Sequence, residues 1–478
     1  MKYLMVCGLF SLLVIKPLVG SSIYTVDQYI EHLLSSHAQP KQFRLREQNS
    51  VYDYNISKAL TDWSFSTSLL SGHSEPYDTS PFSPSYIDTL MAKFSISRPV
   101  LVTGGEISFG VTQQRTKQPP IVFSGNLPIN QSQFFQNMIS MSYRQPLLYG
   151  FSGEIYKTPI AIASTNVTIS TLQSTESLEL FIRDKLSEYI DWSLSHELTE
   201  LSFSRLQLAR ESYNQTKNRV QVNVSEKIDL LRAESALENA HQLWVTQKAQ
   251  LKSFQFKLSV QLDNQSLLQQ SPQFDLYDPV FIKKPSYVVT HRLRAIQALS
   301  LNETAINRKL SLSKSKRNGS LDLIGNYQFL GSGRTHHLSQ HHRDNNSSIA
   351  IEYSRFLSDT AAIEQVKKDT DTLAQFKENK QQLMTDTDAD ILGLFTLIEE
   401  YKTILKITLN QIIISQKKAT AEEALYKQGR SDIDRLIQSQ DDVLNSKLSY
   451  ARLSATYHKH ILAYQALTDE LLAAYGIE

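Results

Sequence analysis

The chain has 478 residues, with 49 lysines and arginines against 48 aspartates and glutamates, which gives a formal net charge of +1. That balance argues against a nucleic-acid-binding protein, because such proteins usually carry a clear basic excess. Charged residues make up 20% of the chain and hydrophobic residues 41%, a composition too apolar for a disordered chain and too polar for a bundle of membrane helices.

Residues 1–21 have the layout of a secretory signal peptide. A positive start at Met1-Lys2 precedes an apolar run, and small residues follow at Gly20 and Ser21. Cys7 is the only cysteine of the chain and lies in this segment. The sequence therefore predicts an exported mature chain without disulfides, zinc–thiolate sites or cysteine nucleophiles. An uncleaved anchor helix is the alternative.

The first half of the mature chain predicts a helix, then strands, then a long helical hairpin. The helix is expected over 24–62, with Thr25 as its N-cap. Alternation of apolar residues with serine and threonine predicts strands, at 63–69, 92–97, 107–111 and 138–144. Two long helical runs follow, over 154–222 and 225–270, and a proline-containing linker occupies 271–285.

The second half predicts the same order of elements. Its segments are a helix over 286–317, strands at 321–329 and 349–353, a long helix over 359–427, and a returning helix over 431–474. The sequence therefore predicts an internal two-fold repeat, with a first repeat over 22–270 and a second over 286–478.

The long helices are supported by the placement of helix-breaking residues. No proline lies between residues 160 and 271, and no glycine lies between 154 and 318; both residue types are costly inside helices. A helix of about 70 residues is on the order of 100 Å long, too long for one globular core. Apolar residues of the last helix, such as Ile433, Leu444, Ala451 and Leu462, also follow steps of three and four. We therefore expect a mainly α fold, with strands, whose long antiparallel helical hairpins pack as coiled coils.

The predicted strands raise the question of closure. If they lie in a membrane, every backbone polar group must be paired, and only a closed barrel achieves this. One chain with so few strands cannot close a barrel, so several copies would have to share their strands.

The hairpin turns carry the most specific motifs. In the second half, Tyr426 is followed by Gly429, Ser431, Asp434 and Leu436 in the run YKQGRSDIDRLIQSQ. This run resembles the returning-helix motif of the TolC-like outer-membrane channel (outer-membrane efflux protein) family. Gly429 suits a left-handed position after a helix, Ser431 is expected to cap the next helix, and Asp434 lies near its positive end.

Two further segments extend this resemblance over the mature chain. In the first half, Asn223 takes the place of the glycine, followed by Ser225 and Asp229. A strand-to-helix segment, QPLLYGF, is similar to another motif of the family; its junction residues are Gln145, Pro146, Leu147 and Gly150.

The resemblance implies a homotrimer in the bacterial outer membrane, with a large periplasmic portion. Each chain would give four strands to a twelve-stranded barrel and two helical hairpins to a periplasmic α-barrel. The first half has more alternating segments than two strands need, so the sequence leaves two alternatives for the hairpin over 63–69 and 92–97, inside or outside that barrel. The implied partners are a periplasmic adaptor (membrane fusion) protein, an inner-membrane pump or ABC exporter, and outer-membrane lipid, with no nucleic acid.

The implied function is an exit duct for tripartite efflux or type I secretion, with passive conduction and a gate at the hairpin tips. Gate or adaptor-contact residues are then expected at both tips, namely Asn223, Ser225, Asp229, Tyr426, Gly429, Ser431, Asp432, Asp434, Arg435 and Gln438. Arg435 and Gln438 align best with the acidic lumen residues of the family, so that acidic ring does not carry over. The alternative for Asp229 and Asp434 is a purely local role as helix N-terminal charges.

Other functions have weaker support in the sequence. His336, His337, His341 and His342 form a histidine-rich loop, but without the spacing or partners of a zinc site, so we expect a solvated loop and no metal. The chain has no nucleophile elbow, zincin motif or phosphate-binding glycine loop, which predicts no enzyme activity and no cofactor. An exported coiled-coil structural or adhesin-like protein without a channel is the main alternative.

Overall fold

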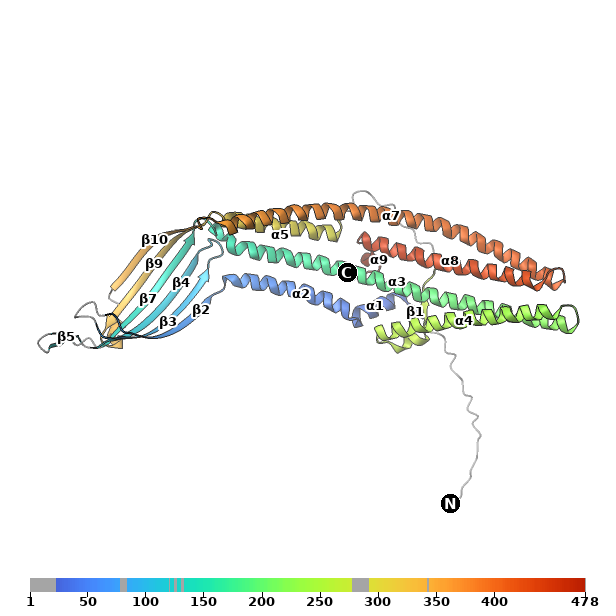
Figure 1. Cartoon of the computed structure of the whole chain (residues 1–478), viewed down its shortest axis with the longest axis horizontal. Coiled ribbons are helices and arrows are strands. Elements are labelled where there is room, and N and C mark those ends of the chain that lie inside the picture. Colours follow the sequence, from blue (N-terminus) through green and yellow to red (C-terminus); the bar gives the residue numbers. More distant parts are fainter. Residues whose placement is uncertain are drawn as a thin grey trace, which may run out of the picture. The chain divides into compact units, whose positions relative to one another are not determined.

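The computed structural model describes residues 23–77, 84–119, 121–123, 127–129, 133–276, 292–341 and 344–477 (Figure 1). The predicted signal peptide and most of the predicted linker lie outside these residues. The chain divides into two compact units. We call them the sheet unit (Arg44–Thr175 and His291–Thr385) and the tip unit (Met1–Phe43, Glu176–Thr290 and Asp386–Glu478).

The sheet unit is built around six long antiparallel strands. They are β2 (Ser64–Ser74), β3 (Ile87–Pro99), β4 (Glu106–Lys117), β7 (Gln133–Pro146), β9 (Ser320–Gly333) and β10 (Asp344–Ser354). Their order across the sheet is β10-β9-β7-β4-β3-β2. A separate short pair, β5 (Ile121–Phe123) with β6 (Leu127–Ile129), lies between β4 and β7 in the chain.

All six strands predicted from the alternation of apolar and polar residues belong to one sheet. The segments predicted at 63–69 and 92–97 form the hairpin β2–β3, and this hairpin belongs to the same sheet as the other strands. Strand β3 pairs with β4 from Asp88 opposite Lys117 to Pro99 opposite Glu106. Because the alternation of apolar and polar residues continues through β2 and β3, these strands fit the sheet without a change of face.

The helices of the sheet unit are joined by polar contacts between segments distant in sequence. The helices of this unit are most of α2 (Ala38–Lys58), α5 (Arg294–Lys316), and the first parts of α3 (Glu154–Gln221) and α7 (Thr360–Lys427). A short 3-10 turn (Ala59–Thr61) follows α2. Lys380 on α7 forms a 3.0 Å ion pair with Glu303 on α5. Thr171 on α3 donates a 2.7 Å hydrogen bond to Glu47 on α2.

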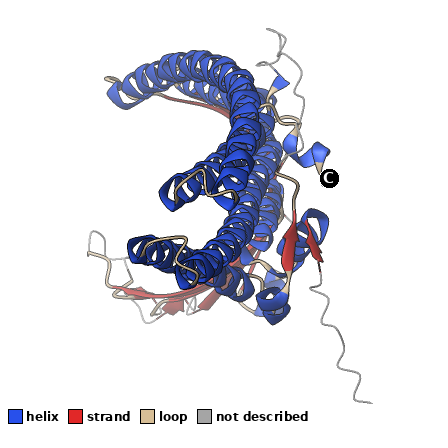
Figure 2. Ribbon diagram, turned by 90° about the vertical axis from the view of Figure 1, so that its right-hand side faces the viewer, coloured by secondary structure: helices blue, strands red, loops and turns tan. Residues whose placement is uncertain are grey.

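The tip unit contains the two helical hairpins. Helix α3 is followed by α4 (Lys227–Gln261), and α7 is followed by α8 (Ile433–Leu467). The helices α3 and α7 are each 68 residues long, and α4 and α8 are each 35 residues long. Helix α4 contacts α8. Both are labelled in Figure 1, and the helices are coloured blue in Figure 2. The seam predicted for the last helix is confirmed, because Ile433, Leu444, Ala451 and Leu462 are all buried.

The largest core of the tip unit gathers aromatic residues around Tyr189 and Trp192 of α3, with Tyr29, Leu258 and Leu462 among its buried members. The Tyr189 hydroxyl donates a 2.6 Å hydrogen bond to the carbonyl of Tyr24 and accepts one of 3.0 Å from the amide of Gln273. These two residues lie in β1 (Ile23–Thr25) and β8 (Ser271–Gln273), which form a parallel pair. The first residues of the predicted linker are therefore held in place against α3.

Several helix boundaries differ from the sequence-based expectation. Thr25 is confirmed as an N-cap, and its side chain accepts a hydrogen bond from the amide of Gln28. The first helix is interrupted, however, so that α1 (Val26–Ser36) ends at His37 before α2 begins. Pro40 lacks the N–H that would continue the hydrogen-bond ladder across this point.

The two returning helices also end earlier than expected. Helix α4 is followed by a 3-10 turn (Gln265–Gln269), and α8 by the short helix α9 (Leu471–Ala474). Asp263 and Asp469 take positive φ angles of 49° and 61° at these two breaks. None of the described helices combines the length and the apolar character needed to cross a lipid bilayer.

Candidate functional site

The two hairpin turns have the backbone geometry that their sequences predict. Asn223 has a φ of 58° between α3 and α4, and Gly429 has a φ of 72° between α7 and α8. Left-handed backbone of this kind favours glycine and, among other residues, asparagine. The predicted equivalence of Asn223 and Gly429 is therefore confirmed for backbone conformation.

The caps of the returning helices correct one sequence-based assignment. Asp432 is the N-cap of α8, and its side chain accepts a 2.8 Å hydrogen bond from the amide of Arg435. Ser431, the predicted cap, instead donates a 2.8 Å hydrogen bond to Glu422 of α7. Aspartate and serine are comparable caps, and Asp432 is the residue directly before the first helical turn.

In the first hairpin, Glu226 is the N-cap of α4, and Ser225 lies one residue earlier. Asp229 completes a capping box with Glu226, accepting a 3.3 Å hydrogen bond from its amide. Asp229 thus satisfies a backbone amide at the start of α4.

Tyr426 is the centre of the contacts between the two hairpins. Its side chain is 3% exposed, and its hydroxyl shares a 2.8 Å hydrogen bond with Thr216 of α3. The Arg219 guanidinium lies 4.5 Å from the centroid of the Tyr426 ring and donates a hydrogen bond to the Tyr426 carbonyl. A cation over an aromatic face is attracted by the ring quadrupole.

An arginine also brings two predicted acidic residues together. Arg232 of α4 lies 3.0 Å from Asp434 of α8 and 3.6 Å from Asp229 of its own helix. Farther from the turns, the buried Arg205 of α3 donates a 2.8 Å hydrogen bond to Asp441 and a 3.2 Å bond to Gln440, both on α8. Three arginines thus link the two hairpins at different distances from the turns, namely Arg205, Arg219 and Arg232.

The sequence reasoning missed these arginines and Thr216. Each lies on a helix with no unusual neighbours in sequence, so no motif marks it. The residues with the best match to the lumen positions of the family, Arg435 and Gln438, are both exposed. Arg435 lies 3.6 Å from Asp432 of its own helix.

The strand-to-helix junction is the second predicted site. Gln145 donates a 2.8 Å hydrogen bond to the carbonyl of Thr103, in the turn between β3 and β4, and one of 2.9 Å to the carbonyl of Pro146. The Leu147 amide donates a 2.6 Å hydrogen bond to the Leu321 carbonyl. These contacts connect the end of β7 to the neighbouring turn and to β9.

Glycines allow the close backbone approach at this junction. Gly104 and Gly150 have φ angles of 77° and 92°, and a Cβ on Gly104 would lie 2.1 Å from the Gly150 carbonyl oxygen. A Cβ on Gly153 would lie 1.9 Å from the Leu101 carbonyl oxygen. Gly150 was predicted as a junction residue, but the facing Gly104 could not be, because the pairing depends on tertiary structure.

The six-stranded sheet has one apolar face. Paired positions from β2 across to β9 carry Phe65, Ile96, Phe109, Met141 and Tyr327 in one row. The next row carries Thr67, Phe94, Val111, Ile139 and Phe329. All the residues of these two rows except Thr67 are large and apolar, and they are 36% to 67% exposed. An exposed apolar surface of this extent normally indicates contact with lipid or with another protein.

The other face of the sheet is polar. Its paired rows carry hydroxyl and amide side chains, such as the row Ser64, Ser97, Ser108, Ser142 and Asn326. Hydroxyls meet across the strands at Ser64–Ser97 (2.8 Å) and Ser108–Ser142 (2.6 Å). This face lines a hollow of about 640 Å³ formed by β3, β4, β7 and β9. The polar face is therefore concave.

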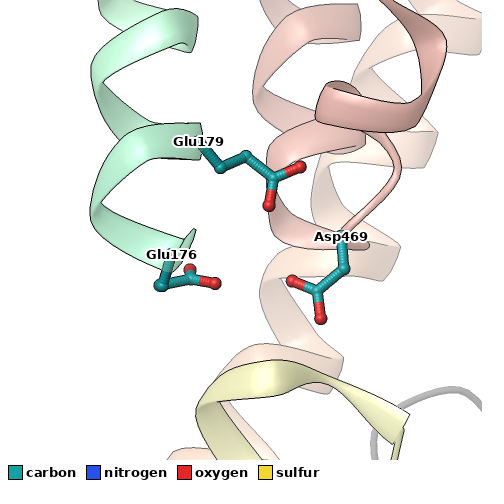
Figure 3. A group of neighbouring side chains, drawn as sticks. All are labelled: Glu176, Glu179 and Asp469. Atoms are coloured by element: carbon teal, nitrogen blue, oxygen red, sulfur yellow. The ribbon is translucent and has the colours of Figure 1, made fainter. Parts of the chain in front are cut away.

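Three carboxylates meet in the tip unit, from Glu176 and Glu179 of α3 and from Asp469 between α8 and α9 (Figure 3). Glu179 is fully buried, and it accepts hydrogen bonds of 2.9 Å and 3.3 Å from the amides of Leu471 and Leu472. The group thus has a structural use, because Glu179 satisfies backbone amides at the start of α9.

The histidine-rich loop contains the short helix α6 (His336–Ser339), and His336, His337 and His341 are exposed. The rings of His337 and His341 lie 5.3 Å apart. His342 lies outside the described residues. The arrangement agrees with the expectation of a solvated loop.

No protein-family model matches the sequence, and no curated protein sequence matches it. The fold, in contrast, matches solved structures of outer-membrane proteins. The CmeC outer-membrane channel of Campylobacter jejuni has a TM-score of 0.68 and 11% identity, over 98% of this chain and 94% of that chain. The outer-membrane protein VceC of Vibrio cholerae has a TM-score of 0.66 and 10% identity, over 92% and 95%.

The open state of the MtrE outer-membrane channel of Neisseria gonorrhoeae has a TM-score of 0.64 and 12% identity, over 93% of this chain and 89% of that chain. Likenesses at this level of identity concern the fold. They confirm, over nearly the whole described chain, the resemblance that the hairpin and junction motifs predict: the protein has the fold of the TolC-like outer-membrane channels.

Proposed function

We propose that three copies of this chain form the outer-membrane exit duct of a tripartite efflux or type I secretion system. The observation that carries the proposal is the separation of the six-stranded sheet into an exposed apolar face and a concave polar face. A soluble sheet buries its apolar face against its own core. A sheet that faces lipid outside and water inside has the pattern observed here.

Strand lengths support a membrane position for this sheet. The six strands have 11 to 14 residues, and a tilted strand needs about 9–11 residues to cross a bilayer. Trp63 and Tyr353 lie at the helix-proximal margin of the apolar face, and Arg98 lies 5.8 Å from the Trp63 ring. Aromatic and basic residues are typical of the boundary between lipid and water.

The helical part would supply the periplasmic duct. Helices α3 and α7 both begin in the sheet unit and end in the tip unit. Their equal lengths, with equal returning helices and a left-handed residue at each turn, support an internal duplication of one hairpin. In a trimer, six such hairpins would surround an axis and form a passive duct. An inner-membrane pump or ABC exporter would supply the energy for transport and would connect to the duct through a periplasmic adaptor.

The gate would lie at the hairpin tips, where Arg219 contacts Tyr426 and Arg232 contacts Asp434. These contacts join the two hairpins of one chain, so moving one hairpin away from the other must break them. Arg435 and Gln438 are exposed nearby and would be available to the lumen or to the adaptor. Rings of such side chains influence which ions pass a constriction.

Conductance in planar lipid bilayers tests the proposal, using purified mature protein. We expect discrete conductance steps, together with heat-sensitive trimers in the outer-membrane fraction of the producing cells. Soluble periplasmic protein without conductance would instead support the structural or adhesin-like alternative.

Two variants test the gate separately from the channel. Asp434→Ala removes an ion pair between the hairpins, whereas Arg435→Ala removes a charge whose ion pair among the described residues is with Asp432, the N-cap of the same helix. We expect D434A to raise the open probability and R435A to change ion selectivity. A channel that is unaffected by both substitutions would refute the gate assignment and leave the duct proposal standing.

A further inference from the structure

The hairpin β2–β3 continues the sheet without interruption. Every residue of β2 from Ser64 to Ser74 pairs with β3, and Ser66 and Ser95 share a 2.7 Å hydroxyl contact. Phe65 of β2 lies on the apolar face and Ser66 on the polar face, as their paired residues do. The face pattern of the other strands thus extends to the edge of the sheet.

The two edges of the sheet suit each other. Strands β2 and β10 both have 11 residues and are exposed along nearly their whole length. Because all neighbouring strands in the six-stranded sheet are antiparallel, β2 and β10 also run antiparallel to each other. An even number of strands per chain lets rotated copies close an all-antiparallel ring.

We propose that β2 of one copy pairs with β10 of the next, so that each copy contributes six strands to the pore wall. This inference rests on the proposed function. With three copies the wall has eighteen strands (three times the six strands of one sheet), instead of the twelve that would result if β2–β3 lay outside it. The occupant of each open edge is therefore a second copy of this chain.

The additional strands change the width of the exit. Strands about 4.8 Å apart with a tilt of about 40° give a backbone radius of about 18 Å for eighteen strands and about 12 Å for twelve. Side chains of the inner face occupy a similar depth in both cases, so the open cross-section increases about threefold or more. An exit of this width, lined mainly by hydroxyl and amide groups, passes bulky hydrated solutes such as polypeptides and leaves selection to narrower parts of the duct.

Cysteine cross-linking between copies tests this inference, because cleavage of the predicted signal peptide leaves a mature chain without cysteine. Ser68→Cys on β2 is combined with a cysteine at each even-numbered position of β10 from 346 to 354, all on the polar face. At full overlap of the two strands Ser68 faces Ala350, and the set covers shifts of about four residues either way. Paired strand residues have the Cα separation that a disulfide requires.

A second series replaces Ser68→Cys by Thr112→Cys on β4, which would be the edge strand if β2–β3 lay outside the pore. Ser66→Cys with Ser95→Cys is the internal control, because this pair lies within one chain and gives no dimer. Mild oxidation of outer membranes, followed by non-reducing electrophoresis, detects the cross-links. Conductance is measured on the same preparations.

Disulfide-linked dimers in the β2–β10 series alone are the expected result. Dimers in the β4–β10 series, with conductance retained, would overturn the inference and leave the duct in place. Dimers in neither series would overturn it as well, and if conductance is also absent, the proposed function fails with it.

Discussion

The contact between Tyr426 and Thr216 gives the sharpest prediction about the proposed gate. Tyr426→Phe keeps the ring and its contact with the Arg219 guanidinium, and it removes only the hydroxyl that bonds Thr216. Thr216 still donates a 2.8 Å hydrogen bond to the Ser212 carbonyl, so no buried donor loses its only partner. The expected cost is therefore one buried neutral hydrogen bond, about 1 kcal/mol.

A change of about 1 kcal/mol corresponds to about a fivefold change in an equilibrium constant. If the contact stabilises the closed state, the Y426F channel should have an open probability about fivefold higher, provided that the unmodified channel is open only a small fraction of the time. If the three chains open together, the costs add and the factor approaches about 10². Single-channel recording in planar bilayers measures this directly.

Tyr213→Phe provides the matched control. Tyr213 packs against the same small core as Tyr426, but its hydroxyl has no hydrogen bond with any described residue. We expect Y213F to behave as the unmodified protein. Equal open probabilities for Y426F, Y213F and the unmodified channel would refute the reasoning, because the hydrogen bond would then contribute nothing to closure.

Three further predictions concern stability. Gly104→Ala should destabilise the protein by about 2–5 kcal/mol, because Gly104 has a positive φ and the new Cβ would overlap the Gly150 carbonyl oxygen. Gly72→Ala is the control and should leave stability unchanged, because a Cβ on Gly72 would point into open space. The temperature at which the assembly dissociates compares the two variants. Asp441→Ala should lower the unfolding free energy by about 1–3 kcal/mol, because it removes the carboxylate partner of the buried Arg205; an unchanged denaturant midpoint would contradict this.

The third prediction in this group concerns acid. Burial alone would raise the pKa of Glu188, but hydrogen bonds and charge from Lys185 and Lys257 lower it below its ordinary value. A lowered folded-state pKa gives stability that is present above the unfolded pKa and is lost as the pH falls through the folded pKa. Glu188→Gln should therefore flatten the acid side of a stability curve measured below about pH 5, and a variant with the unmodified pH profile would exclude this role.

The sequence predicted the elements whose signals are local. Glycine- and proline-free runs gave the long helices, period-two alternation gave the strands, and Asn223 and Gly429 gave the turns. These features depend on backbone propensity and on residues a few positions apart. The cap at Asp432 was missed in favour of Ser431, because both are good caps and local sequence does not rank them.

The features that the sequence did not predict depend on contacts between distant segments. Strand β3 pairs with β4 only in the folded sheet, and the order of strands in a sheet is not encoded in any one segment. Gly104 packs on Gly150 because two turns that are distant in sequence meet. The Arg232 contact with Asp434 joins residues about 200 positions apart. Sequence patterns indicate that a residue is charged or small, but they do not name the partner.

The position of the sheet in lipid is the central claim, and alternate labelling along β7 tests it most directly. Single cysteines replace Ile139, Ser140, Met141 and Ser142 in turn, in the otherwise cysteine-free mature chain, and intact outer membranes are treated with a water-soluble maleimide or a lipid-soluble one. We expect the water-soluble reagent to label the cysteines at 140 and 142, and only the lipid-soluble reagent to label those at 139 and 141. Equal labelling of all four positions by the water-soluble reagent would contradict the account, because both faces of the sheet would then be in water.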